Sequence, residues 1–410
     1  MKTDESIPNL RHLRMFMSTC ELGSINAAAG AMHVAQPAIT QAISKLEARF
    51  GSPLLSRHRE GSLPTPAGRI LHGRCDRFFR QMHAAIMLAP ERIHAPGSQQ
   101  AATLAGRLTV SQISALIGVA NHGSLWLAAH NEGVSVSAMH RAAKEIENNL
   151  GYAVFSKARN RLNVNHSGAE LARRLQIALR EIAVAEEEIR SLSGQPDGKI
   201  LIGTLPMIRS ALLGLTINRT LAQAPGLRFE VLEGVYATML RALRNGEIDM
   251  LIGALRRPSP ANDVNERLLF TDPYAIIARK GHPLEGTEAS AAELLQYEWV
   301  VQKQGTPVRA ALEAIFAGTG LSPHVAVETS SMSLTRSILL DSDRLAILSR
   351  RQITIEERAG LLTALPLSIA STGRRIGLTT RQDWQPAGSH LIFLENFHSV
   401  LIENVGALEE

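Results

Sequence analysis

The chain has 410 residues, of which 45% are apolar and 4% aromatic, and its mean hydropathy is zero. At roughly one domain per 150 residues, this length predicts two or three globular domains with ample core. The apolar fraction excludes a disordered chain, and no apolar run approaches the roughly 20 residues that span a bilayer. The acidic N-terminus resembles no export signal, so we expect a soluble, cytoplasmic protein with no membrane contact and with Cys20 and Cys75 as reduced core residues.

The charge is unevenly distributed along the chain. Residues 1–192 hold 22 basic and 15 acidic residues, a balance of +7, whereas residues 193–410 hold 21 and 23, a balance of −2. A basic front joined to a nearly neutral remainder is typical of a nucleic-acid-binding segment followed by a domain with another role. Charge alone also allows a basic N-terminal segment that binds no nucleic acid.

An internal repeat organises the first half. Residues 10–74 align without a gap on residues 110–174, an offset of 100. The identical pairs include Gly23/Gly123, Ser24/Ser124, Ala28/Ala128, Ala29/Ala129, Val34/Val134, Glu47/Glu147, Gly51/Gly151, Arg59/Arg159 and Gly68/Gly168. Apolar positions agree as well, so we interpret this as a duplicated domain.

Each copy has the pattern of a winged helix-turn-helix. Glycine at 23 or 123 predicts a helix end, and serine at 24 or 124 caps a short alanine-rich helix. The third helix of copy one places Ile39, Ile43, Leu46 and Phe50 on one face and leaves the other face polar. A short apolar strand then leads to a basic hairpin tip, which we interpret as the wing.

These residues resemble the N-terminal domain of LysR-type transcriptional regulators. The matching runs are Gly23 to Ala29, His33 to Thr40, Leu46-Glu47, Pro53 to Arg57 and Thr65 to Gly68. The family usually has serine at the position of Ala35, so alanine here removes a helix cap worth about 1 kcal/mol. The family usually has an aromatic residue at the position of Leu55. Copy two keeps Ser135 and Phe155 but has Val136-Ser137 where the family has Gln-Pro, so its resemblance is weaker.

The polar face of each third helix predicts contacts with the DNA major groove. Glutamine can bond an adenine edge in two places, and a threonine methyl can contact thymine. Basic wing residues would meet phosphates and set the register without reading bases. The candidates are Gln36, Pro37, Thr40, Gln41, Lys45, Arg57 and Arg59 in copy one, and Ser137, His140, Arg141, Lys157, Arg159 and Arg161 in copy two. Any one of them could instead be an ordinary solvated residue.

Two helices and a link connect these parts. Residues 67–90 carry one apolar stripe, and a longer stripe runs from about Ala169 to Leu192. Such a stripe needs a partner helix, and the resemblance implies that residues 167–192 dimerise the protein. Residues 91–107, which include Pro96-Gly97-Ser98, predict a flexible link.

From residue 194 onward short apolar strands alternate with helices, at Lys199 to Leu205, Arg228 to Leu232 and Asp249 to Ile252, and predict a parallel α/β sheet. Gly203-Thr204-Leu205-Pro206, Gly281 to Leu284 and Gly305-Thr306-Pro307 resemble the effector domain of the same family. The resemblance implies a two-lobed, periplasmic-binding-protein-like fold over residues 194–410. The chain would cross between the lobes near Asp272–Tyr274 and return near Arg381.

The same resemblance implies a small-molecule cleft between the lobes, and helix N-termini there favour anionic or polyhydroxy ligands such as an organic acid or a sugar. Our candidates for ligand contacts are Thr204, Gly234, Thr306, Thr329, Ser330 and Ser331. Helix capping explains the hydroxyl residues among them about equally well, with Thr204 and Ser330 each placed at a helix start.

The fold expected is therefore multidomain: winged helix-turn-helix domains at residues 8–66 and 108–166, followed by the effector domain. The function expected is a sequence-specific regulator of transcription that binds double-stranded DNA as a homodimer or homotetramer, on an interrupted inverted repeat. No catalytic motif, metal site or cofactor site is found, so we expect no enzyme. The alternative is a DNA-architectural or silencing protein whose C-terminal domain only oligomerises.

Overall fold

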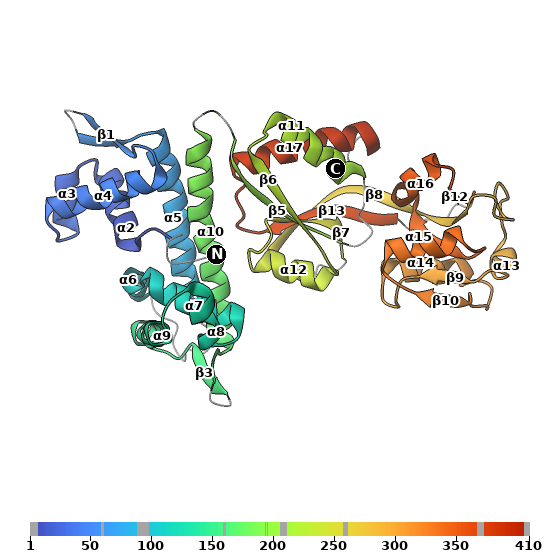
Figure 1. Ribbon diagram of the computed structural model, residues 1–410, viewed down its shortest axis with the longest axis horizontal. Coiled ribbons are helices and arrows are strands. Elements are labelled where there is room, and N and C mark those ends of the chain that lie inside the picture. Colours follow the sequence, from blue (N-terminus) through green and yellow to red (C-terminus); the bar gives the residue numbers. More distant parts are fainter. Residues whose placement is uncertain are drawn as a thin grey trace. The chain divides into compact units, whose positions relative to one another are not determined.

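The computed structural model describes residues 7–58, 61–87, 98–158, 161–192, 194, 196–205, 211–256, 261–366 and 373–405. It divides into two compact units, an N-terminal unit made mainly of residues 1–198 and a C-terminal unit made mainly of residues 199–410. Figure 1 shows the helices and strands of both units. Each unit is described separately below.

The first half of the N-terminal unit is a winged helix-turn-helix. Its elements are α2 (Leu10–Leu22), α3 (Ile25–Ala31), α4 (Gln36–Phe50), the antiparallel hairpin β1 (Leu55–His58) and β2 (Gly61–Pro64), and α5 (Pro66–Met87). Gly23 ends α2 in a left-handed conformation, and the Ser24 hydroxyl caps α3 by accepting from the Ala27 N–H. The predicted apolar stripe of α4 is buried, which confirms the helical pattern.

Residues 98–191 repeat this order of elements after one additional helix. They form α6 (Ser98–Arg107), α7 (Val110–His122), α8 (Leu125–Glu132), α9 (Val136–Leu150), the hairpin β3 (Phe155–Ala158) and β4 (Arg161–Val164), and α10 (His166–Ser191). Gly123 and Ser124 end α7 and cap α8 as their counterparts do 100 residues earlier. The helices α7 and α9 have the same lengths as α2 and α4.

Two local contacts recur at the same offset of 100 residues. The carboxylate of Glu47 accepts from the backbone N–H groups of residues 54 and 55, and that of Glu147 accepts from those of residues 154 and 155. A Cβ on Gly68 would lie 2.0 Å from the Leu54 carbonyl oxygen, and a Cβ on Gly168 would lie 2.0 Å from the Val154 carbonyl oxygen. Glycine is therefore required where each long helix passes the start of its hairpin.

The expectation of a flexible link over residues 91–107 is wrong for its second part. Residues 98–107 form α6, while residues 91–97 lie outside the described residues. Ala101, Leu104 and Ala105 are buried in the core of the N-terminal unit, and their spacing gives α6 an apolar face. Pro96 and Gly97 precede the helix and do not interrupt it.

The long helix α10 begins at His166, three residues before the expected start, because the Asn165 side chain accepts from the Gly168 N–H and caps it. Its apolar stripe packs on α5 of the same chain. The partner helix that this stripe requires is therefore α5 of the same chain, and dimerisation through residues 167–192 stays a prediction. One core cluster runs from Leu10 through α5 and α6 to Ile189.

The C-terminal unit is built on one mixed sheet with the strand order β10-β9-β11-β8-β13-β7-β5-β6, and β12 pairs with β8. The strands are β5 (Gly198–Thr204), β6 (Leu227–Glu233), β7 (Met250–Ala254), β8 (Val264–Arg279), β9 (Trp299–Val301), β10 (Val325–Glu328), β11 (Leu345–Ser349), β12 (Leu362–Ala364) and β13 (Gly373–Arg381). The helices are α11 (Ala211–Gln223), α12 (Tyr236–Arg244), α13 (Ala291–Leu294), α14 (Pro307–Phe316), α15 (Met332–Leu340), the short 3-10 turn η1 (Arg350–Ile353), α16 (Thr354–Arg358) and α17 (Gly388–Val405).

Two strands join the lobes and make the sheet mixed. β5 and β7 pair in parallel, as the sequence predicted, whereas β8 and β13 run antiparallel to their neighbours. β8 pairs with β13 up to Pro273 and with β11 from Tyr274 onward, so the chain crosses between the lobes at the predicted place. β13 is antiparallel to both β7 and β8. The return lies at Gly373, where β13 begins, and not near Arg381, whose guanidinium is buried against the Leu243 and Ile248 carbonyls.

No single helix among the described residues is long and apolar enough to cross a membrane. The helices at residues 99–107 and 110–122 reach the length and apolar content of a membrane span only when they are taken together, and the chain bends by 91° between them.

Candidate nucleic-acid interface and effector cleft

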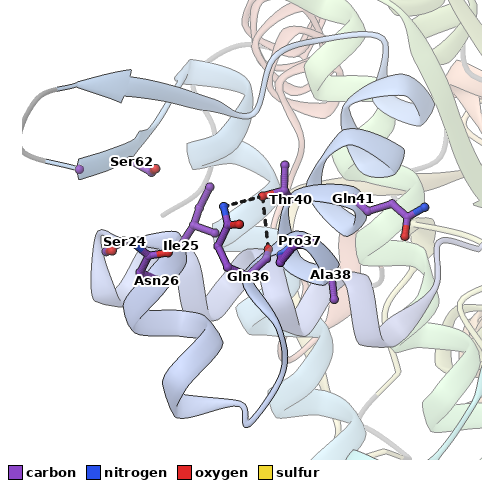
Figure 2. A pocket seen from close by; sticks show the side chains of 10 residues that line it. Ser24, Ile25, Asn26, Gln36, Pro37, Ala38, Thr40, Gln41 and Ser62 are labelled. Carbon is purple, nitrogen blue, oxygen red and sulfur yellow. Dashed lines mark hydrogen bonds between the residues drawn. The ribbon is translucent and has the colours of Figure 1, made fainter.

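The exposed face of α4 forms one wall of an open groove. Figure 2 shows this groove between α3, α4 and the start of β2, lined by Ser24, Ile25, Asn26, Gln36, Pro37, Ala38, Thr40, Gln41, Gly61 and Ser62. The Gln36 amide donates to the Thr40 hydroxyl at 3.2 Å, and Gln41 extends away from this pair. Four of the sequence-predicted DNA contacts therefore lie together on one polar surface.

Helix periodicity produces this arrangement. Ile39, Ile43 and Leu46 are buried, so the positions between them turn outward and leave Gln36, Pro37, Gln41 and Lys45 exposed. The first turn of α4 begins at Ala35, which makes no side-chain cap, as the sequence predicted. Its free N–H groups point along the helix axis from the end that also carries Gln36.

The structure describes the strands of each wing hairpin but not the hairpin tips. Arg57 lies in β1, Lys157 in β3 and Arg161 in β4, and only their backbone positions are described. Arg59 and Arg159 lie outside the described residues.

The face of α9 that corresponds to the α4 groove differs in chemistry. Ser137, His140 and Arg141 are exposed on it, as predicted. Val136 replaces Gln36 and is 45% exposed, and Trp126 replaces Asn26 and is 62% exposed. The Trp126 ring stacks on His130. Sequence reasoning missed Trp126, although an aromatic residue at a polar position of the repeat was a visible signal.

The effector cleft is a cavity of about 290 Å³ within the C-terminal unit. Its lining includes Leu205, Val235, Tyr236, Ala254, Arg256, Tyr274, Gln302, Lys303, Thr306, Pro307, Val308, Ser330 and Arg374. These residues come from both lobes and from the crossing strands β8 and β13. The cavity therefore lies between the two lobes of the C-terminal unit.

Two of the six predicted ligand residues, Thr306 and Ser330, line this cavity. Thr306 also caps α14 by accepting from the Arg309 N–H. The residue that caps α15 is Ser331 and not Ser330, because its hydroxyl accepts from the Leu334 N–H, so the placement of Ser330 at a helix start is corrected by one residue.

The other predicted ligand residues lie beside the cavity. The Thr329 hydroxyl accepts from the Ser331 N–H, and the Gly234 N–H donates to the Thr204 carbonyl. Thr204 is 6% exposed, and its hydroxyl has no hydrogen-bond partner among the described residues. Residues 206–210, which follow Thr204 and Leu205, lie outside the described residues.

The cavity lining combines basic groups with an unsatisfied hydroxyl. Arg374 is buried and donates to Asp272 at 2.5 Å, so its charge is compensated within the protein. The Arg256 guanidinium lies 5.1 Å from the centre of the Tyr236 ring, and Lys303 is exposed. Burial raises the pKa of Tyr274 to about 12, which keeps its hydroxyl protonated, and that hydroxyl has no hydrogen-bond partner in the described part of the chain. A buried donor without a partner is unfavourable until a ligand supplies an acceptor.

Sequence reasoning missed Tyr236, Arg256, Tyr274 and Arg374, since no local motif marks residues that converge from separate strands. The described part of the chain contains no group of three or more His, Cys, Asp or Glu residues placed to hold a metal ion.

Comparison with known proteins decides the family. Residues 10–69 match the family described as "Bacterial regulatory helix-turn-helix protein, lysR family", and residues 193–397 match the "LysR substrate binding domain". The "HTH-type transcriptional regulator GalR" of Pseudomonas putida is 31% identical over 92% of this chain and 94% of its own length. The chain belongs to the LysR family of transcriptional regulators. It is a DNA-binding transcriptional regulator with a substrate-binding effector domain.

Other relatives cover less of the chain. The "Uncharacterized HTH-type transcriptional regulator YdcI" of Escherichia coli is 25% identical over 68% of this chain and 91% of its own length. A full-length OxyR variant from Pseudomonas aeruginosa superposes with a TM-score of 0.52 at 19% identity over 70% of this chain and 97% of its own, which shows the shared fold. Residues 70–192 of this LysR-family chain lie outside both matched stretches.

Proposed function

We propose that this LysR-family regulator reads DNA sequence with the exposed face of α4 and contacts DNA a second time through residues 108–166. The observation that carries the proposal is the groove of Figure 2, where Gln36 and Thr40 present amide and hydroxyl groups on an exposed helix face. Gln36, Pro37, Thr40, Gln41 and Lys45 would enter the major groove, and Arg57 and Arg59 of the wing would meet phosphates.

Residues 108–166 support a second winged helix-turn-helix by their order of elements and by the repeated Glu147 and Gly168 contacts. Ser137, His140 and Arg141 occupy the outward face of α9, and Lys157, Arg159 and Arg161 belong to its wing. Because Val136 and Trp126 replace polar groups of copy one, this copy is suited to phosphate and apolar contacts more than to bidentate base contacts.

The test of sequence reading is a comparison of cognate and random DNA at a fixed salt concentration. Gln36→Ala should lose about 1–3 kcal/mol on the cognate site and little on random DNA. Arg57→Ala serves as the control, because a wing residue that meets phosphates should weaken binding to both DNAs about equally. Equal losses on the two DNAs for Gln36→Ala would show that α4 is not the reader.

We further propose that the effector is a small anionic molecule, an organic acid in preference to a neutral sugar. Arg256 and Lys303 line the cavity, and the Tyr274 hydroxyl donates to no acceptor among the described residues. A carboxylate would satisfy that hydroxyl and pair with the basic groups.

A thermal-shift screen of the full chain with small carboxylates and matched neutral polyols tests this assignment. A ligand at 100 times its dissociation constant stabilises the folded protein by about 2.7 kcal/mol, which is a measurable rise in melting temperature. Tyr274→Phe should reduce the rise, and a response to polyols alone would reverse the assignment. A chain that no small molecule stabilises would favour the architectural alternative.

A further inference from the structure

The two long helices of the N-terminal unit pack against each other within one chain. In Figure 1, α5 and α10 lie side by side and run in opposite directions. Arg74 of α5 forms a two-bond ion pair with Glu188 of α10, at 2.8 and 2.9 Å, and a third bond to Glu181 at 3.0 Å. Arg77 also pairs with Glu181 at 3.0 Å. Arg74 and Glu181 are each 8% exposed, so these charges are removed from water.

The helices α5 and α10 hold equivalent places in the repeat, each following its own hairpin. When equivalent helices of two copies pack in an antiparallel manner, the copies are related by an approximate two-fold rotation, as two subunits of a dimer would be. Here both copies belong to one chain.

We infer that the two N-terminal copies form an internal pair, so that a single chain offers two unlike recognition helices, α4 and α9, to two unlike DNA half-sites. The inference rests on the proposed function in one respect, namely that residues 108–166 contact DNA. The internal pairing itself does not depend on that role.

The charges of the two helices favour the unlike pair. α5 carries four arginines and one aspartate, a balance of +3, and α10 carries five glutamates and four arginines, a balance of −1. Two α5 helices from different chains would bring Arg74 and Arg77 together without the glutamates that hold them here. Because a buried charge that loses its partner is strongly unfavourable, an α5–α5 pair between chains is disfavoured.

Contacts on the other side of α5 also belong to the same chain. α6 packs on α5, and Arg14 of α2 donates to the carbonyls of Ala105 and Gly106 at the end of α6. The two copies are therefore joined by one continuous core. A short covalent connection, ten residues between Met87 and Ser98, gives the internal pair a high effective concentration relative to any second chain.

The recognition faces of the pair are not alike. Positions 36, 40 and 41 of α4 are Gln, Thr and Gln, and the corresponding positions of α9 are Val, His and Arg. A pair of identical helices would read an inverted repeat, whereas this pair should read two different half-sites. The expected interrupted inverted repeat would then relate the pairs of two chains, not the two recognition helices of one chain.

Co-expression of two charge-reversed full-length chains tests whether the pairing is internal. One chain carries Arg74→Glu, and the other carries Glu181→Arg with Glu188→Arg. Each chain alone places like charges together, and we expect hydrogen-exchange protection of its α5 and α10 peptides to fall by at least about 100-fold. If the pairing is internal, co-expression restores no protection. If the helices pair between chains, the complementary charges meet in a heterodimer, and recovered protection would overturn the inference.

Two further variants complete this test. The triple variant Arg74→Glu, Glu181→Arg, Glu188→Arg reverses every charge within one chain and should recover most of the protection, and failure to recover would overturn the claim that these ion pairs specify the pairing. Arg80→Glu is the matched control, because Arg80 lies on α5 with its side chain 68% exposed and pairs locally with Asp76. It should leave the protection of α10 unchanged.

Selection of binding sites from random duplexes by the full chain tests the half-sites. Two recurrent and unlike half-sites are expected within the stretch bound by one chain, and an inverted repeat of one half-site sequence with no second, unlike half-site beside it would overturn this part of the inference. A single half-site, found together with intact internal pairing by hydrogen exchange, would refute the DNA role of residues 108–166 and leave the internal pair standing.

Discussion

One hydroxyl group distinguishes the starts of the helices α4 and α9. Ser135 caps α9 by accepting from the Ala138 N–H at 3.2 Å, whereas Ala35 leaves the start of α4 without a side-chain cap. Both N-cap residues have extended backbone angles, at φ −69° and ψ 140° for Ala35 and φ −69° and ψ 145° for Ser135. The backbone at residue 35 is therefore already arranged for a serine cap.

We accordingly predict that Ala35→Ser stabilises the protein by about 0.5–2 kcal/mol, because the new hydroxyl satisfies one free N–H of the first turn. Ser135→Ala is the matched reverse change and should destabilise by a similar amount. Denaturant unfolding of the full chain measures both. An Ala35→Ser variant with unchanged stability would show that water already satisfies this helix end as well as a cap would.

A pH dependence follows from Glu170 in the first turns of α10. The Arg173 side chain hydrogen-bonds its carboxylate, with Arg174 close by, and the pKa of Glu170 is lowered from 4.5 to about 2. A carboxyl whose pKa is lowered by folding stabilises the folded state above its unfolded pKa, and this contribution is lost as the pH falls through the folded pKa.

Glu170→Gln should therefore be less stable than the parent protein near neutral pH, and the difference should shrink as the pH falls from about 4.5 towards 2. The side chain is 28% exposed, so we expect the effect to be modest and weakened by salt. Unfolding free energies measured across that pH range check it, and Arg173→Ala should show the same trend. A difference that does not vary with pH would exclude the ion pair as its cause.

At the scale of elements, one side chain from another helix contacts the C-terminus of α6. Arg14 of α2 donates to two carbonyls at the C-terminus of α6, and its guanidinium lies 5.0 Å from the centre of the Phe79 ring. Burial lowers the pKa of Arg14, as expected for a cation with little access to water. These contacts satisfy helix-end carbonyls that would otherwise lack donors.

Arg14→Ala should destabilise the protein by about 1–3 kcal/mol, since two carbonyls lose a charged donor. Arg11→Ala removes the same charge from an exposed position of the same helix and should change stability by less than about 0.5 kcal/mol. Thermal or denaturant unfolding of the two variants gives the comparison. Equal effects would mean that Arg14 acts through net charge and not through α6.

Local sequence patterns predicted most of the elements because their signals are local. Gly23, Ser24 and the apolar face of α4 predicted the helix-turn-helix. The alternating apolar and helical segments after residue 194 predicted the strands and helices of the C-terminal unit. The failures concern contacts between distant segments. α6 follows Pro96-Gly97 but gains its stability by packing on α5, and the return strand β13 is defined by pairing with β8 across about 100 residues. The pattern of residues within one segment does not predict which distant segment it will contact.

The candidate sites also divide into residues that a local pattern predicts and residues that come together from distant segments. The exposed positions of α4 follow from helical periodicity, so Gln36 and Gln41 were found. The effector cavity is assembled from several strands and helices, so the sequence offered Ser331, which caps α15 and does not line the cavity, and gave no sign of Tyr274 and Arg374, which do line it.

On the scale of the whole molecule, the uneven charge has a measurable consequence. The excess of +7 in residues 1–192 should attract DNA phosphates through both copies, while residues 193–410 contribute −2. Each phosphate contact releases counterions, so the logarithm of the binding constant falls with the logarithm of salt concentration by about 0.9 per contact.

Replacing Lys157, Arg159 and Arg161 with alanine should reduce the magnitude of that slope by about 2–3, on cognate and random DNA alike. Arg219→Ala is the control, because Arg219 is a basic residue of the C-terminal unit that pairs with Glu403 on the surface. Its slope should match the parent protein. An unchanged slope for the triple variant would exclude phosphate contacts by the second wing.

The copies share buried residues and differ on their exposed faces, which has a consequence for how this regulator can change over generations. In an assembly of identical subunits, one codon change alters both readers at once, and both half-sites of an operator must change to match. If both copies contact DNA as proposed, Gln36 and Val136 lie at separate codons of one gene and mutate independently. One half-site can then drift while the other is retained, so an operator can acquire a new specificity through single-step intermediates that remain bound.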